Sequence, residues 1–208
     1  MVHTFTRKQY DDTGEDLYKE FMISIYNKTT KHNNFGNVII YFHNLKYDYN
    51  VLKGFMHVIG APTEKDGQLY EVKVMFRKKI FTFRDSLKLA NMRLDQFNKA
   101  FQLPEKYNKK EAINYDYYTK YNINDFKTEV EVYTKGKDKE WKETFRKNLE
   151  LDIFNYEKVN GIEYFDAQAY YKYYLKYDVL ILQKGLEKFN ENIKEIVKRL
   201  DNNFNKTN

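Results

Sequence analysis

The sequence predicts an α/β fold, and three observations lead to that prediction. Residues 38–42 form a continuous apolar run of strand length, as expected for a strand covered on both faces. Residues 68–76 and 80–83 read as two antiparallel strands that flank a basic turn. Apolar residues recur at helical spacing along residues 186–200. At 208 residues the chain suits a single domain of ordinary size.

The other elements follow from the same patterns. Residues 2–5 alternate in polarity and predict a short strand. Residues 119–160 show so little hydrophobic periodicity that we interpret them as an insertion. Apolar stripes predict four further helices: one capped by Asp16, one along 51–59, one along 94–101, and one from Asp166 through Asp178 to Leu182.

The composition favours a polyanionic partner and excludes functions that depend on cysteine. The net charge of +6 favours a polyanionic partner such as nucleic acid, although a lysine-rich surface without such a partner fits the charge equally well. The absence of cysteine excludes disulfides, thiolate metal sites and cysteine nucleophiles. No apolar stretch reaches the ~20 residues of a membrane span. The bias toward Lys, Asn, Tyr, Phe and Ile is typical of A+T-rich coding, which fits an organelle, linear plasmid or virus, with the mitochondrial matrix as the expected location.

The octet Tyr-Phe-His-Asn-Leu-Lys-Tyr-Asp at residues 41–48 carries the first chemical signal. Asn44 and Asp48 follow the carboxyl end of the strand predicted at 38–42, and open α/β sheets place their active sites at that end. The alternative is that one of the two side chains only caps the next helix.

Tyr174 and Asp178 carry the second signal. They are four residues apart, so a helix would place them on one face. A carboxylate beside a phenol can bind a hard cation and orient water on it. The alternative is one more aromatic pair on a tyrosine-rich helix.

Together these segments resemble the 3′–5′ exonuclease domain of protein-primed family B DNA polymerases. The octet is similar to that family's second exonuclease motif, and Tyr174 with Asp178 matches the third, Tyr-x-x-x-Asp. Between them, Asp-Ser-Leu-Lys at 85–88 resembles the Ser-Leu motif, and 110–113 resembles the Lys-x-x-hydrophobic motif. The resemblance implies a ribonuclease H-like exonuclease fold.

The resemblance also implies roles in metal binding and catalysis. Asp48 and Asp178 would be carboxylate ligands of Mg²⁺ or Mn²⁺. Tyr174 would orient the attacking water, and Lys110 would stabilise charge at the scissile phosphate.

A second group of residues would bind single-stranded DNA. By resemblance, His43 and Asn44 would touch the 3′ end, and Tyr47 would stack near it. Ser86 and Leu87 would hold the primer strand. We expect these residues to face Tyr174 and Asp178 across a shared cleft.

The family's first motif, Asp-x-Glu on a central strand, has no match. The acidic residues ahead of the first predicted helix, Asp11, Asp12 and Glu15, do not form it. We therefore expect a domain truncated at its N-terminus, an incomplete ribonuclease H-like fold without its first strands, and no two-metal hydrolysis by this chain alone. The strand at 38–42 would then have an unpaired edge, which another chain or rearranged packing would cover.

Two functions remain open at this stage. The first is a remnant or fragment of a proofreading domain that binds single-stranded nucleic acid. The second is a catalytically dead copy that serves as a structural subunit binding RNA and protein in a large assembly, such as a mitochondrial ribonucleoprotein. A basic α/β domain with accidental motif matches is the third alternative.

Overall fold

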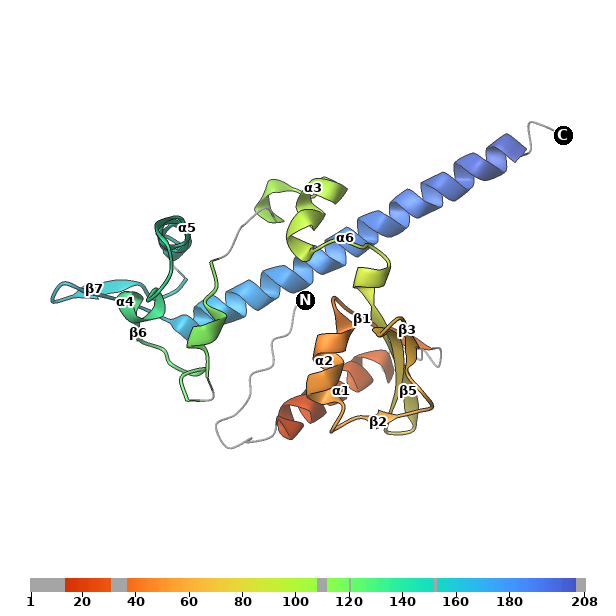
Figure 1. The fold of residues 1–208 in the computed structure, drawn as a ribbon, viewed down its shortest axis with the longest axis horizontal. Helices are drawn as coiled ribbons and strands as arrows, with labels where there is room; N and C mark the ends of the chain where they lie inside the picture. The colour runs from red at the N-terminus through yellow and green to blue at the C-terminus, as the bar shows by residue number, and fades with distance from the viewer. Residues whose placement is uncertain (1–13, 31–36, 108–111, 120, 152, 205–208) are drawn as a thin grey trace. The chain divides into compact units, whose positions relative to one another are not determined.

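The computed structural model describes residues 14–30, 37–107, 112–119, 121–151 and 153–204 (Figure 1). They form two compact units. The first unit contains the described residues up to Phe97 and those from Gly185 onward, and the second contains those from Asn98 to Lys184. The strand predicted at 2–5 lies outside the described residues, so it stays a prediction. The single domain with an insertion at 119–160 also stays a prediction.

A mixed sheet organises the first unit and confirms the α/β class. Its strands are β1 (Val38–Phe42), β2 (His57–Val58), β3 (Thr63–Lys65), β4 (Gln68–Phe76) and β5 (Lys79–Asp85). The order is β1-β5-β4-β2, and β3 also pairs with β4. β1 runs parallel to β5, whereas the pairs that β4 makes with β2, β3 and β5 are antiparallel. The mixture arises because a tight turn links β4 to β5, while α2 and the strands β2, β3 and β4 separate β1 from β5.

Two helices, α1 (Glu15–Thr30) and α2 (Leu45–Leu52), lie together on one side of this sheet (Figure 1). Tyr18 and Met22 of α1 and Leu45 of α2 are buried in one cluster with the inward side chains of β4 and β5. The last turn of α1 holds Thr29 and Thr30, whose hydroxyls donate to backbone carbonyls one turn earlier. These bonds accompany the helix to its end at Thr30.

The expectation that β1 is covered on both faces is wrong. Its side chains alternate, with Ile39 and Tyr41 exposed at 41% and 38% on the face away from α1 and α2. Among the described residues, β1 pairs with β5 alone, so it forms an edge of the sheet. An apolar run of five residues can thus be half-buried, which periodicity alone does not reveal.

Two helix predictions need correction. The helix expected along 51–59 ends early: α2 stops at Leu52, and His57–Val58 forms the strand β2. Phe55 and Met56 still pack against the core, but from the turn between these elements. The helices expected at 166–182 and 186–200 are one continuous helix, α6 (Ala167–Phe204), because no proline interrupts the sequence between them.

The second unit combines a small sheet with helices around an aromatic core. Its elements are α3 (Phe97–Phe101, which begins in the first unit), β6 (Thr128–Glu129), α4 (Val130–Tyr133), α5 (Lys139–Leu149), β7 (Glu157–Val159), β8 (Ile162–Phe165) and the first part of α6, with 3₁₀ turns at Glu105–Tyr107 and Tyr115–Tyr117. Tyr133 is fully buried among rings that include Phe145, Phe165 and Tyr170. Most of the poorly patterned stretch 119–160 therefore folds, and it supplies much of this core. No helix in the described part of the chain is both long and apolar enough to cross a membrane.

Candidate active site and nucleic-acid interface

The ends of two parallel strands create the candidate site in the first unit. Phe42 at the end of β1 is in register with Asp85 at the end of β5. The residues that follow, His43 with Asn44 and Ser86 with Leu87, therefore leave the sheet next to each other. Four of the five residues assigned to nucleic acid by resemblance are thus brought together from segments about 40 residues apart in the sequence.

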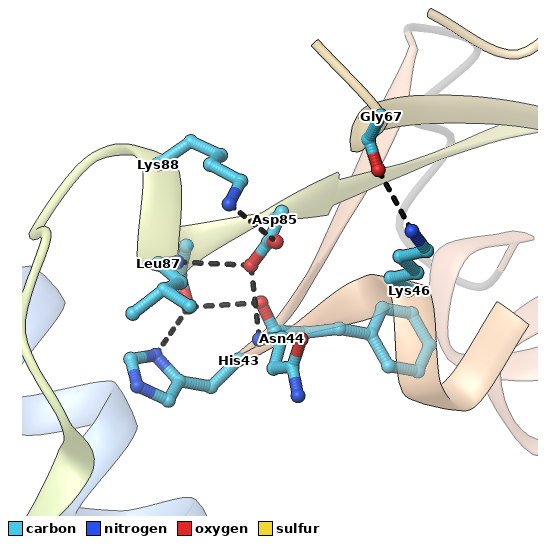
Figure 2. A network of polar contacts seen from close by, with 9 residues as sticks. His43, Asn44, Lys46, Gly67, Asp85, Leu87 and Lys88 are labelled. Carbon is cyan, nitrogen blue, oxygen red and sulfur yellow. Dashed lines mark hydrogen bonds and ion pairs between the residues drawn. The ribbon is translucent and has the colours of Figure 1, made fainter. Parts of the chain in front are cut away.

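The carboxylate of Asp85 joins these two segments (Figure 2). Its Oδ1 accepts the backbone N–H of Asn44 at 2.9 Å and the backbone N–H of Leu87 at 3.0 Å. Its Oδ2 lies 3.9 Å from Lys88 Nζ. Asp85 is only 3% exposed, and it also caps the 3₁₀ turn at Ser86–Lys88. Sequence reasoning gave Asp85 no role, although an aspartate directly before Ser-Leu-Lys at a strand end is a recognisable capping signal.

His43 is held from several sides. The Ser86 hydroxyl donates to the carbonyl of Phe42 at 2.8 Å, and its oxygen also forms a hydrogen bond with His43 Nδ1 at 3.2 Å. The imidazole also meets the Phe97 ring edge-on, with 5.3 Å between centroids. Burial lowers the pKa of His43, and Asp85 partly opposes that shift. These contacts make His43 a packing residue as much as a surface for a ligand.

Asn44 does not act as the helix cap that sequence reasoning allowed. It occupies the cap position of α2 with a left-handed backbone, φ 71° and ψ 54°, and its side chain makes no capping hydrogen bond. The side chain is exposed at the strand end. Tyr47, in the first turn of α2, is 70% exposed and offers an open aromatic face. An exposed amide and an exposed ring at a strand end are suited to a base or sugar.

Asp48 is half-buried in the first turn of α2. Burial raises the pKa of Asp48 to about 6, the carboxylate's bond to its own backbone N–H opposes the shift, and Asp85 adds to it. A carboxylate is the donor that Mg²⁺ and Mn²⁺ prefer, so Asp48 fits the metal-ligand role chemically. The neighbouring Asp85 is a poor second ligand because protein donors already occupy it.

Tyr174 and Asp178 lie one turn apart on α6, in the second unit. This confirms the predicted helix, and the Tyr174 hydroxyl hydrogen-bonds to the Asp178 carboxylate. Tyr115 adds a hydroxyl contact to Tyr174, and their rings meet edge-on. Burial raises the pKa of Asp178, and the bond from Tyr174 opposes that shift.

Several expectations about this site stay predictions. Lys110, Asp11 and Asp12 lie outside the described residues. Asp48 and Asp178 belong to different units, so a shared cleft between them stays a prediction. Within the ranges that the structure describes, no three acidic or histidine side chains gather as a metal site. Asp48 in the first unit and Asp178 in the second are the two predicted carboxylate ligands. A single carboxylate does not hold two metal ions.

A family model described as DNA polymerase type B, organellar and viral, matches residues 27–208. Searches of curated proteins and of solved structures found no significant match.

Proposed function

Because the chain belongs to the organellar and viral type B DNA polymerases, we propose that it is a remnant or fragment of their proofreading 3′–5′ exonuclease domain. In this proposal the chain binds a single-stranded 3′ end where β1 and β5 terminate. The observation that carries the proposal is the junction of Asn44 with Ser86 and Leu87 around one buried carboxylate.

The chemistry around this junction suits a single strand. Tyr47 can stack on a base, and the Asn44 amide can donate to or accept from a base or sugar. Lys46 and Lys88 lie on the two sides of the junction, Lys46 bonded to the carbonyl of Gly67 and Lys88 5.9 Å from the centroid of the Tyr70 ring (Figure 2). Both are cations beside the junction and would attract phosphate. The net charge of +6 supports the same class of partner.

The sheet of the first unit would be part of a ribonuclease H-like sheet. The parallel pair β1–β5 and the antiparallel pair β5–β4 support this assignment, and the unpaired edge of β1 is where further strands would add. A strand that carries Asp-x-Glu, supplied in trans, is expected to restore cleavage.

By itself the chain would bind nucleic acid without hydrolysing it. Two-metal hydrolysis requires ligands that hold one ion at the attacking water and another at the leaving oxygen. Asp48 and Asp178 would be the ligands for Mg²⁺ or Mn²⁺, and Asp85 is occupied by Asn44, Leu87 and Lys88. Sparse carboxylates bind Mg²⁺ weakly, because the ion gives up its water reluctantly.

Fluorescence anisotropy with labelled oligothymidylate, its duplex and oligouridylate tests the binding proposal, in EDTA so that nothing is cleaved. We expect the single-stranded DNA to bind more tightly than the duplex, with affinity that falls as salt rises. Equal or absent binding of both DNAs would contradict the proposal. The same oligonucleotide incubated with Mg²⁺ or Mn²⁺ should stay intact on a denaturing gel, and metal-dependent loss of 3′ nucleotides would contradict the predicted inactivity.

A second candidate function is a catalytically dead copy that binds RNA and protein in a large assembly. The specific observation in its favour is the β1 edge, where Ile39 and Tyr41 are exposed beside an unpaired row of backbone groups among the described residues. Co-purification with a large ribonucleoprotein, together with tighter binding of oligouridylate than of oligothymidylate, would favour this candidate.

A further inference from the structure

We propose that Asp85 is the positioning residue of this interface: its carboxylate holds the segments after β1 and β5 together, so that both present their polar groups to the same strand of nucleic acid. The inference deepens the proposed function and rests on it. It assigns a role to a residue outside the groups expected to touch DNA or metal.

The hydrogen bonds of a single oxygen support this role. Asp85 Oδ1 accepts one N–H from its own turn, at Leu87, and one from the end of the other strand, at Asn44. The carboxylate is 3% exposed, so water cannot easily replace it as the acceptor. Hydrogen bonds to an ionised acceptor are the stronger kind, which suits a contact that fixes geometry.

Asn44 depends on this contact for its position. Its backbone is left-handed and its side chain makes no capping bond. The carbonyl of Asn44 accepts from Tyr47 N–H at 3.0 Å, and this bond ties Asn44 only to its own helix. The bond from Asn44 N–H to Asp85 therefore fixes the residue relative to β5 and to Ser86 and Leu87.

An Asp85 that served as a metal ligand would behave differently from one that serves as a positioning residue. Two amides donate to Oδ1, and the Lys88 ammonium forms a long ion pair with Oδ2 at 3.9 Å, so protein groups already lie at both oxygens. An asparagine could still accept both N–H groups at its Oδ1, but it would be a much poorer ligand for Mg²⁺. In EDTA, substitution of a metal ligand would leave binding unchanged, whereas a positioning residue should lose binding with alanine and keep it with asparagine.

The first test measures anisotropy of labelled oligothymidylate with the full chain in EDTA. We expect Asp85→Ala to weaken binding by about tenfold or more, since two N–H groups lose their buried acceptor. Asp85→Asn should bind within about threefold of the unchanged protein. Asp95, exposed beside Arg93, provides matched charge controls as Asp95→Ala and Asp95→Asn. Asp85→Asn binding as poorly as Asp85→Ala, with both variants folded by circular dichroism, would overturn the inference.

A double-mutant cycle with Asn44→Gly tests whether Asp85 acts through Asn44. Glycine tolerates the left-handed backbone and keeps the N–H, so only the side chain is removed. If Asp85 positions that side chain, Asp85→Ala should cost clearly less affinity in the Asn44→Gly background than alone. Equal costs in both backgrounds, which a general loss of stability would give, would contradict the inference.

A readout without nucleic acid separates this inference from the proposed function. In ¹⁵N NMR spectra, the amides of Asn44 and Leu87 should be protected from hydrogen exchange in the unchanged protein and in Asp85→Asn, and both should lose protection in Asp85→Ala. Protection that persists in Asp85→Ala would overturn the positioning role. The unchanged protein and all variants could fail to bind oligothymidylate while the amide protection follows the expected pattern. That result would overturn the proposed function and leave the local geometry correct.

Discussion

Asn44 combines a left-handed backbone with an exposed side chain, so its two contributions can be separated by substitution. Asn44→Gly should keep stability close to that of the unchanged protein but weaken single-strand binding severalfold. Asn44→Ala should weaken binding similarly and also lose about 1 kcal/mol of unfolding free energy, because an alanine Cβ disfavours this conformation. Urea denaturation and anisotropy measure the two effects. Full binding by Asn44→Gly would show that the amide makes no contact.

Asp48 gives the site a pH dependence whose sign can be worked out. Its pKa is about 3.8 in the unfolded chain and is raised to about 6 in the folded chain, mainly by burial. The folded state thus holds the proton more tightly, and stability falls as pH rises from the lower value to the higher one. The loss of stability caused by the ionised Asp48 is complete above about pH 6, and it is absent below the unfolded pKa of about 3.8.

Asp48→Asn should therefore stabilise the chain at neutral pH, by on the order of 1–2 kcal/mol once solvent screening of this partly exposed group is allowed for. The gain should disappear below the unfolded pKa. Urea denaturation across the pH range, in EDTA, measures it, with the exposed Asp95→Asn as control. A gain that is the same at acidic and neutral pH would contradict the raised pKa.

At the scale of elements, sequence patterns predicted some strands well and failed where tertiary contacts decide. β1 and β4 have the expected bounds and β5 extends by a few residues, because apolar runs bounded by turns are strong local signals. The parallel pairing of β1 with β5 has no local signal, and it is this pairing that brings Asn44 to Leu87. The octet thus predicted a site but could not reveal Asp85 as its centre.

α6 shows a second tertiary effect at Gly185. Glycine is unfavourable inside a helix by about 1 kcal/mol relative to alanine, which calls for a packing reason. Here a Cβ at position 185 would overlap the fully buried Phe97 ring, and that ring packs edge-on against His43. The glycine thus lets α6 approach the aromatic residue that supports the site.

Gly185→Ala should lower the unfolding free energy by about 1–2 kcal/mol despite the better helix propensity, since the Phe97 ring must move. Gly54→Ala is the matched control, because nothing lies within 4 Å of its added Cβ. Thermal unfolding compares the two, and adding Phe97→Leu to Gly185→Ala should cost less than the sum of the single effects. A stabilised Gly185→Ala would show that the ring has room to shift.

At the scale of the whole molecule, the described residues form two aromatic-rich cores, one under the β1–β5 sheet and one around Tyr133. The composition, with 20 Tyr and 16 Phe, indicated enough apolar material for a core but not its division in two. Helical and strand periods are hard to recognise where tyrosine occupies both buried and exposed positions, as Tyr133 and Tyr121 do. For that reason residues 119–160 had no clear pattern, although they supply Val130, Tyr133 and Phe145 to the second core.

The β1 edge determines how the whole molecule meets other chains. The β1 sequence Val-Ile-Ile-Tyr-Phe has neither charge nor proline, and within the described ranges it pairs on one side only. Proteins normally avoid an apolar, uncharged strand at an open sheet edge. We therefore expect the chain alone to associate through this edge as its concentration rises.

The substitution Ile39→Lys tests this expectation, because it places a charge on the exposed face of β1 without touching the core face. It should keep the chain monomeric in light scattering after size exclusion, with thermal stability almost unchanged. Val179→Lys, at a similarly exposed apolar position on α6, is the control and should associate like the unchanged chain. If Ile39→Lys associates as strongly as the control, then β1 is not the surface through which chains meet, and the case for strand addition at this edge is lost.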